Sequence, residues 1–305
     1  MKVIRDLSQS SVDRETVLTI GAFDGLHLGH QSLLKKLMQS AQEAKRLSGV
    51  VTFDPLPRTV LTSSCGLLCL TSIEDKIELL QTWGLDILVI VPFTLEVSRT
   101  SARDFVWPLR DRLRMAELWV GWNFALGRGR EGDVPALQKL GQEMGFDVHV
   151  VEPVSDGSAV ISSTQIRNLL GAGRVSEAAE MLGRYYQFSG VVLPARASEP
   201  QTSLVSARLR VERICSLLAS GVYATYVIVQ GRRYPSATHI ATEPAYEDDK
   251  PTVEIHLPDY EGELTGKRIQ VQFVERLRDE RRFASEKTLR AQIKKDMARA
   301  REILT

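Results

Sequence analysis

Two histidines three residues apart follow a glycine-rich turn near the start of the chain, in the stretch Thr19–His30, which reads TIGAFDGLHLGH. Gly21 and Gly25 let the backbone approach a ligand closely and take conformations that a Cβ would block. On a first helical turn His27 and His30 would face the same way, beside backbone N–H groups that attract anions. The pattern predicts a site for the phosphates of a nucleotide.

The spacing separates this turn from the commoner phosphate loops. It contains neither the G-x-x-x-x-G-K-[ST] pattern nor the dinucleotide pattern G-x-G-x-x-G. Either histidine alone would be explained equally well by packing, so the prediction rests on the whole pattern. Two histidines in place of a lysine resemble the HxGH nucleotidylyltransferases, here as His27-Leu28-Gly29-His30.

A second stretch, Ile161–Arg167, combines hydroxyl groups with a cation and reads ISSTQIR. Helix capping by Ser162 or Ser163 would by itself explain the hydroxyl groups. Capping does not require Arg167, whose guanidinium on the first helical turn is suited to phosphate. We therefore expect Ser163, Thr164 and Arg167 to bind phosphate groups.

The composition is that of a globular protein without a strong preference for polyanions. The chain has 305 residues, of which 43% are hydrophobic and 25% charged, and its formal net charge is +1. This length favours two domains, and the near-neutral charge argues against a nucleic-acid surface. Only three cysteines occur, with no signal-peptide pattern and no apolar run long enough to span a bilayer. These features predict a cytoplasmic protein that does not attach to membranes.

Strand-like and helix-like segments alternate over the first half of the chain. Apolar residues at helical spacing predict helices at Ser32–Lys45 and Ser72–Trp83. The apolar strands expected between them are Val17–Ile20, Gly49–Phe53, Asp86–Val91, Leu118–Val120 and Val148–Val151. The alternation predicts a Rossmann-like α/β domain with a parallel sheet covered on both faces, and such sheets bind ligands beyond the carboxyl ends of their strands.

Short strands dominate after Tyr185. Val253–Leu257 and Ile269–Val274 alternate apolar and polar residues, which is typical of half-buried antiparallel strands. From Ser285 onward, apolar residues at helical spacing predict an amphipathic helix that packs on these strands. We therefore predict a nucleotidylyltransferase domain at residues 1–184 and a small antiparallel β-barrel, or a sandwich, with a terminal helix at residues 185–305.

Over nearly its whole length the chain resembles the prokaryotic bifunctional riboflavin kinase/FAD synthetase family. Besides the two motifs above, the matching segments of the first half are Thr52–Pro57, Thr71–Leu80 with Lys76, Asp86 with Phe93, and Gly121–Phe124 with Gly127 and Gly132. The resemblance implies an FMN adenylyltransferase, which transfers AMP from ATP to FMN and releases pyrophosphate. It also implies substrate contacts from Gly21, Phe23, Asp24, Gly25, Phe53, Pro57 and Asn123.

Such a transfer needs positioning more than a general base, because the FMN phosphate is already anionic at neutral pH. We expect His27 and His30 to hold the α- and β-phosphates of ATP. Ser163, Thr164 and Arg167 would hold the β- and γ-phosphates, and Mg²⁺ would neutralise the remaining charge.

The second half departs from the family at its kinase site. Glu254 matches the catalytic base that the resemblance implies, but the glycine-rich loop followed by Pro-Thr-Ala-Asn is missing. In its place, within Leu193–Leu209, Ser206 replaces the threonine and Arg208 replaces the asparagine, both of which are expected to hold the ATP-bound metal. A positive charge where Mg²⁺ should bind predicts a degenerate domain with weak or no riboflavin kinase activity.

Three alternatives remain open from the sequence. The chain could be a fully bifunctional enzyme with an unusual kinase loop. It could be a nucleotidylyltransferase with another phosphate acceptor, although the flavin-type motifs and the kinase-like second half favour FMN. It could also be a non-catalytic flavin-binding regulator, although the two complete phosphate motifs favour an enzyme. The sequence does not predict the oligomeric state.

Overall fold

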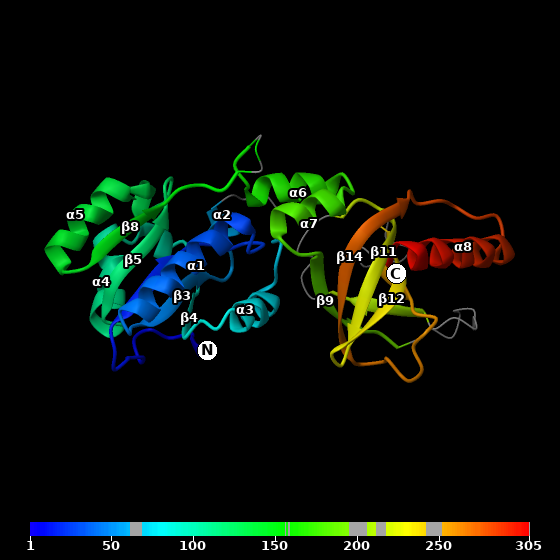
Figure 1. The fold of residues 1–305 in the computed structure, drawn as a ribbon, viewed down its shortest axis with the longest axis horizontal. Coiled ribbons are helices and arrows are strands. Elements are labelled where there is room, and N and C mark those ends of the chain that lie inside the picture. Colours follow the sequence, from blue (N-terminus) through cyan, green and yellow to red (C-terminus); the bar gives the residue numbers. More distant parts are fainter. Residues whose placement is uncertain are drawn as a thin grey trace. The chain divides into compact units, whose positions relative to one another are not determined.

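A computed structural model of the chain describes residues 1–61, 69–155, 157, 159–194, 206–211, 218–241 and 252–304. Cys65, Cys215 and most of the altered kinase loop (195–205) lie outside these residues. Contacts divide the chain into two compact units, the first formed by Met1–Cys69 and Ile73–Ser162, the second by Leu70–Ser72 and Ser163–Thr305. Each unit is described by itself below (Figure 1). The domain boundary expected after residue 184 stays a prediction.

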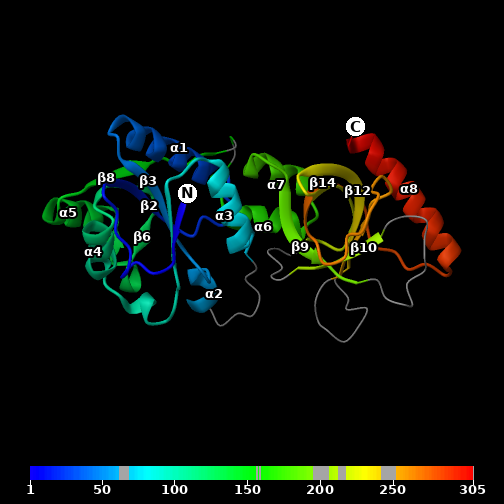
Figure 2. The same cartoon turned by 90° about the horizontal axis from the view of Figure 1, so that it is seen from below.

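The first unit is a parallel sheet between two layers of helices, as the alternating pattern predicts (Figure 2). Its strands run in the order β1-β4-β3-β2-β5-β8, and every neighbouring pair is parallel. The strands are β1 (Lys2–Ile4), β2 (Thr16–Ile20), β3 (Leu47–Phe53), β4 (Ile87–Val91), β5 (Met115–Gly121) and β8 (Asp147–Val151). The Rossmann-like α/β prediction is confirmed for this unit.

Two hydrophobic cores, one on each face, hold the helices to this sheet. Buried residues of α1 (Leu28–Glu43) and α3 (Ile73–Thr82) form one core with β3 and β4. Those of α4 (Ala102–Arg112) and α5 (Val134–Met144) form the other with β2 and β5. The shorter elements of the unit are α2 (Pro57–Leu61), β6 (Ala125–Leu126), β7 (Gly132–Asp133) and the 3-10 turns Val97–Arg99 and Arg128–Arg130.

The second unit is a closed antiparallel barrel with strands in the order β10-β13-β12-β11-β14-β9. The strands are β9 (Tyr186–Val192), β10 (Ser206–Arg210), β11 (Gly221–Val229), β12 (Arg232–Ala241), β13 (Thr252–His256) and β14 (Arg268–Arg278). Alternate residues such as Val253 and Ile255 point into a buried core, so the predicted half-buried pattern is confirmed. Helices α6 (Ser163–Gly171) and α7 (Val175–Leu182) contribute to the same core.

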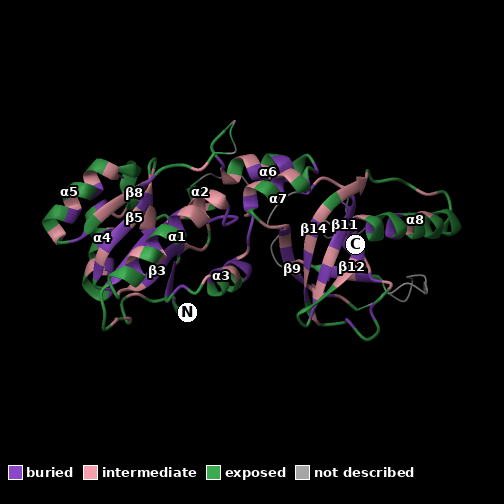
Figure 3. Cartoon of the chain, in the orientation of Figure 1, coloured by how far each residue is buried: buried purple, intermediate pink, exposed green. Residues whose placement is uncertain are grey.

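The C-terminal helix α8 (Glu286–Leu304) packs on the outside of the barrel, as its amphipathic pattern predicts. Met297, Ala300 and Leu304 form a separate small core with Val222 and Ala224 of β11. The opposite side of α8 is exposed along most of its length (Figure 3). Among the described residues of the chain, no helix is both long and apolar enough to cross a bilayer.

Helix α1 begins earlier than its apolar spacing predicts, at the turn where the histidine motif indicates a helix start. The expected start was Ser32, whereas the helix starts at Leu28 with His27 as its N-cap residue. Gly29 lies in the first turn, and glycine disfavours helix interiors. Apolar spacing alone therefore misses this turn. The difference matters because both histidines belong to the start of the helix itself.

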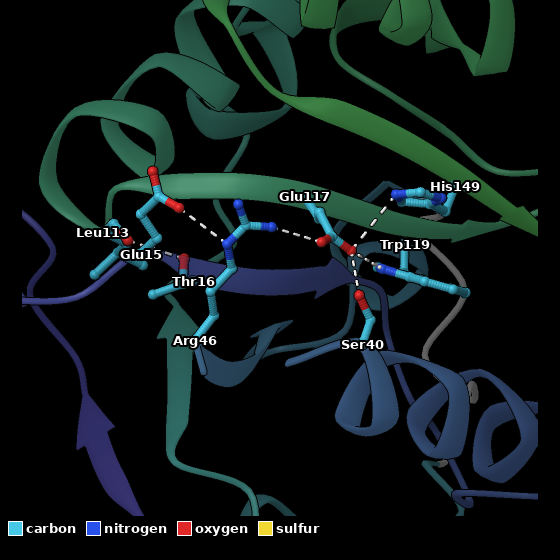
Figure 4. Close-up of polar contacts among 8 residues, drawn as sticks. All are labelled: Glu15, Thr16, Ser40, Arg46, Leu113, Glu117, Trp119 and His149. Carbon is cyan, nitrogen blue, oxygen red and sulfur yellow. Dashed lines mark hydrogen bonds and ion pairs between the residues drawn. The ribbon is translucent and has the colours of Figure 1, made fainter. Parts of the chain in front are cut away.

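A buried carboxylate ties the far end of α1 to the sheet (Figure 4). Glu117 on β5 is 7% exposed and accepts hydrogen bonds from Ser40 of α1 at 2.6 Å and from Arg46 at 2.7 Å. The Trp119 indole donates to it at 2.9 Å, and His149 of β8 lies 3.5 Å away. Burial by itself would raise the pKa of Glu117, but these donors and charges lower it overall. Glu117 therefore stays ionised while it joins three elements.

Replacing Glu117 with alanine should lower the free energy of unfolding by about 3 kcal/mol, because Arg46, Ser40 and Trp119 all lose their shared acceptor. Glu15→Gln is the matched control: Glu15 contacts the other side of Arg46 at 2.9 Å but is 47% exposed, so the loss should stay below about 1 kcal/mol. Urea unfolding monitored by circular dichroism measures both.

Because the folded-state pKa of Glu117 lies below its ordinary value of 4.5, its contribution is fully present above that pH. The contribution should be lost as the pH falls through the folded-state pKa. Equal losses for Glu117→Ala and Glu15→Gln at pH 7 would contradict this account.

Candidate functional site

Three of the segments singled out in the sequence, Thr19–His30, Thr52–Pro57 and Gly121–Phe124, lie at the carboxyl edge of the parallel sheet. The Gly21 N–H donates to Val51 of β3 at 3.0 Å, which fixes the start of the turn after β2 beside the end of β3. On the other side, Thr19 pairs with Trp119 of β5, and the Trp122 N–H donates to Val151 of β8 at 3.2 Å. The turns after β2, β3, β5 and β8 therefore leave the sheet from one edge.

The two histidines stack on each other at the start of α1. Their ring centroids lie 3.7 Å apart at an interplanar angle of 24°, and the Phe23 ring lies 5.0 Å from that of His30. His27 has extended backbone (φ −68°, ψ 171°) and is 7% exposed. Both imidazoles thus occupy one side of the helix start, where backbone N–H groups and the helix dipole favour an anion.

The turn before the histidines has an unusual backbone. Phe23 and Leu26 adopt left-handed conformations (φ 45° and 44°) although they are not glycine, and both side chains are buried. Gly25 between them has φ 82°, which glycine adopts without strain. Burial of two apolar side chains therefore holds the turn in a shape that the chain would otherwise avoid.

The second motif divides between the two units. Ile161 belongs to the first unit, and its carbonyl oxygen lies 3.9 Å from where a Cβ on Gly29 would stand. The chain entering the motif thus passes beside the histidines. Ser163, Thr164 and Arg167 lie on the first turns of α6, in the second unit. Their contribution to the phosphate site stays a prediction.

The other residues expected to contact the substrates occupy the end of β3, the start of α2 and the turns after β2 and β5. Phe53 ends β3 and packs edge-to-face on Phe93 with centroids 5.5 Å apart, and Pro57 begins α2. Asn123 lies in the turn after β5, where its carbonyl accepts a hydrogen bond from Arg130 at 3.2 Å. Asp24, in the turn after β2, is 2% exposed. Their substrate contacts stay predictions.

Lys76 is a residue to which the sequence gave no role beyond a family match. Its side chain is 2% exposed, and its ammonium donates to the Ala22 carbonyl at 2.7 Å and to the Thr52 hydroxyl at 3.2 Å. A lysine side chain normally reaches solvent, so its residue type argues against burial. Only the position of Lys76 on the apolar face of α3 could have indicated that its side chain is buried.

A second candidate site lies on the outside of the barrel under α8. Strand register places Arg208, Glu254 and His239 side by side on β10, β13 and β12. They line a cavity of about 370 Å³ together with His256 and with Asp296 of α8. The Asp296 carboxylate binds Arg278 through two guanidinium nitrogens, at 2.7 and 3.0 Å. The three predicted kinase-site residues, Ser206 included, are thus gathered in one cavity.

Basic side chains surround the carboxylate of Glu254 in this cavity. His239 Nδ1 lies 3.7 Å from a Glu254 oxygen, and this contact is the main cause of the lowered pKa of Glu254. Burial acts in the opposite direction, and His256 and Arg208 lower the pKa further. A general base works best with a pKa near the operating pH. The pKa of Glu254 therefore lies further from neutral pH than that of an unperturbed glutamate.

Known proteins that resemble the chain span its full length. Residues 9–165 match the family model described as FAD synthetase, and residues 182–304 match the one described as riboflavin kinase. The bifunctional riboflavin kinase/FMN adenylyltransferase of Escherichia coli (strain K12) is 34% identical over 307 residues, 99% of this chain and 97% of the relative. The protein of that description from Pseudomonas fluorescens is also 34% identical, over 99% of this chain and 98% of its own.

A solved structure has the same fold. It is a crystal structure described as a macrolide-efflux protein from Streptococcus pneumoniae, with a TM-score of 0.87 and 23% sequence identity, and the match covers 98% of both chains. This likeness shows the architecture alone.

The barrel cavity gives a pH prediction. Burial lowers the pKa of His256 below its ordinary value of 6.5, while Glu254 raises it in part. Glu254→Gln should therefore lower the His256 pKa further, and Glu143→Gln, in the other unit, should leave it unchanged. NMR titration of the imidazole resonances, assigned with His256→Gln, measures each value. A His256 pKa at or above 6.5 in the unmodified protein would contradict the description of this cavity.

Proposed function

The chain belongs to the family of bifunctional riboflavin kinase/FMN adenylyltransferases, and from this we propose that it makes FAD from FMN and ATP but phosphorylates riboflavin weakly or not at all. Adenylyl transfer is assigned to residues 1–184 and the degenerate kinase to residues 185–305. The observation that carries the first assignment is the stacked pair His27 and His30 at the amino end of α1. The observation that carries the second is Arg208 beside Glu254.

The transfer forms one bond and breaks one. A phosphate oxygen of FMN attacks the α-phosphorus of ATP, and the bond from that phosphorus to the bridging oxygen of pyrophosphate breaks, giving FAD. Negative charge grows on the α-phosphate oxygens and on the leaving pyrophosphate. His27 and His30 donate to these oxygens from fixed positions, which stabilises the charge as it develops. The helix start adds its unpaired N–H groups.

The remaining charge is assigned to the second motif and to Mg²⁺. Ser163 and Thr164 would donate hydroxyl hydrogen bonds, and Arg167 would pair with the β- and γ-phosphates. Mg²⁺ is usually held by nucleotide phosphates with one or two carboxylates, and Asp24 is the carboxylate of the histidine turn. No group of three or more His, Cys, Asp or Glu side chains gathers as a metal site among the described residues. One carboxylate beside the nucleotide phosphates is the donor set expected for a Mg²⁺ ion that arrives with ATP.

Full bifunctionality is the second candidate, since both family models match and both relatives carry that description. Two observations favour the degenerate kinase. Arg208 lies opposite Glu254 in the strand register and brings a positive charge to the position expected to hold the metal. His239 approaches Glu254 from the other neighbouring strand, so the base is held between two basic side chains.

Removing either histidine should slow FAD formation from FMN. His30→Asn should reduce kcat about 100-fold, because the loss of one donor to a developing oxyanion typically has that effect. Lys139→Met, on the exposed side of α5, serves as the control and should match the unmodified protein. Chromatography of the flavin products with ATP and Mg²⁺ measures both. A His30→Asn enzyme with unchanged kcat would remove the histidines from the mechanism.

The kinase assignment is tested with riboflavin and FMN supplied separately to the same preparation. We expect FAD from FMN and no FMN from riboflavin above the blank. Arg208→Asn removes the misplaced charge and should raise riboflavin phosphorylation, whereas Arg210→Asn on the same strand should not. Robust phosphorylation of riboflavin by the unmodified protein would establish the bifunctional alternative.

A further inference from the structure

The buried ammonium of Lys76 contacts the turn that precedes the two histidines. It donates to the Ala22 carbonyl at 2.7 Å, and the Thr52 hydroxyl donates to the same carbonyl at 3.1 Å. Lys76 and Thr52 also contact each other at 3.2 Å. Two donors from separate elements, α3 and β3, therefore fix the direction of one carbonyl group.

Fixing the Ala22 carbonyl also fixes the next N–H. In a planar trans peptide the carbonyl and the following N–H point in opposite directions. With the Ala22 oxygen turned toward Lys76, the Phe23 N–H is turned away from it. Phe23 is 2% exposed, yet its N–H has no acceptor among the described residues. Buried N–H groups are almost always paired, so this donor is suited to an acceptor supplied by a ligand.

The position of Phe23 relates this donor to the phosphate site. Its ring lies 5.0 Å from that of His30, so residue 23 stands beside the histidine pair. Its left-handed backbone, with φ 45°, is a conformation that needs support from neighbouring contacts. Lys76 supplies such a contact at the preceding peptide.

We propose that Lys76 is a positioning residue of the adenylyl-transfer site: it holds the Ala22–Phe23 peptide so that the Phe23 N–H donates to a phosphate of ATP. The inference rests on the proposed FMN adenylyltransferase function. Lys76 itself does not touch the nucleotide in this arrangement. Lys76 acts by orienting the Ala22–Phe23 peptide. Its buried positive charge also stabilises the negative charge of the ATP phosphates.

The test compares Lys76→Met, which keeps the length of the side chain without its donors, with Thr52→Val and with the surface control Lys139→Met. Lys76→Met should lower kcat/KM for ATP about 100-fold, the typical effect of one misdirected oxyanion donor. Thr52→Val keeps the hydrogen bond from Lys76 to the Ala22 carbonyl, so it should lower kcat/KM for ATP only about five-fold. The KM for FMN should change less than about two-fold, and Lys139→Met should behave as the unmodified protein.

Ligand binding separates positioning from a general loss of structure. By calorimetry, Lys76→Met should weaken binding of ATP and leave binding of adenosine, which lacks phosphates, unchanged. Equal weakening of both ligands, or unchanged kcat/KM for ATP in a folded Lys76→Met enzyme, would overturn the proposal. If thermal unfolding shows that Lys76→Met does not fold, Thr52→Val becomes the test. An unchanged kcat/KM for ATP in Thr52→Val would then overturn the proposal. Absence of FAD formation by the unmodified protein would instead refute the proposed function.

Discussion

Parallel pairing of β2 with β3 and β5 is the constraint on which the transferase site depends. Because parallel strands end at the same edge, the turns that follow them are brought together whatever their separation in the sequence. The pairing of Thr19 with both Val50 and Trp119 sets this edge. Gly21, which follows β2, therefore leaves the sheet between the ends of its two neighbours. A shift of one register step would displace the histidine turn from the others.

Helix α1 is fixed at both ends relative to this edge. At its amino end, the preceding turn is anchored through the Ala22 carbonyl by Lys76 and Thr52. Near its carboxyl end, Ser40 reaches the buried carboxylate of Glu117. Both anchors use buried charges, which are stable only when their hydrogen bonds are satisfied. Burying a charge costs free energy. Here two buried charges fix the position of α1, the helix that begins at the two histidines.

The barrel shows how the same alternation of residues produces both a core and a cavity. Val253 and Ile255 point inward, so Glu254 and His256 must point outward, where α8 covers them. The cross-strand register then decides which charges meet. Arg208 and His239 are neighbours of Glu254 because β10 and β12 flank β13, and this proximity governs the pKa of the carboxylate.

The sequence by itself determined the order of elements, the alternation of the strands and the chemistry of the HxGH turn, because these depend on residues close together in the chain. Apolar spacing placed helix α1 only from Ser32, because Gly29 interrupts the pattern, whereas the histidine motif already indicated a helix start at His27–His30, and the helix begins at Leu28. Tertiary structure alone decided that the ammonium of Lys76 is buried against Ala22, and that Arg208 and His239 both face Glu254. Those contacts join strands and helices that are distant in sequence. Local propensity carries no information about such pairings, which packing and strand register select.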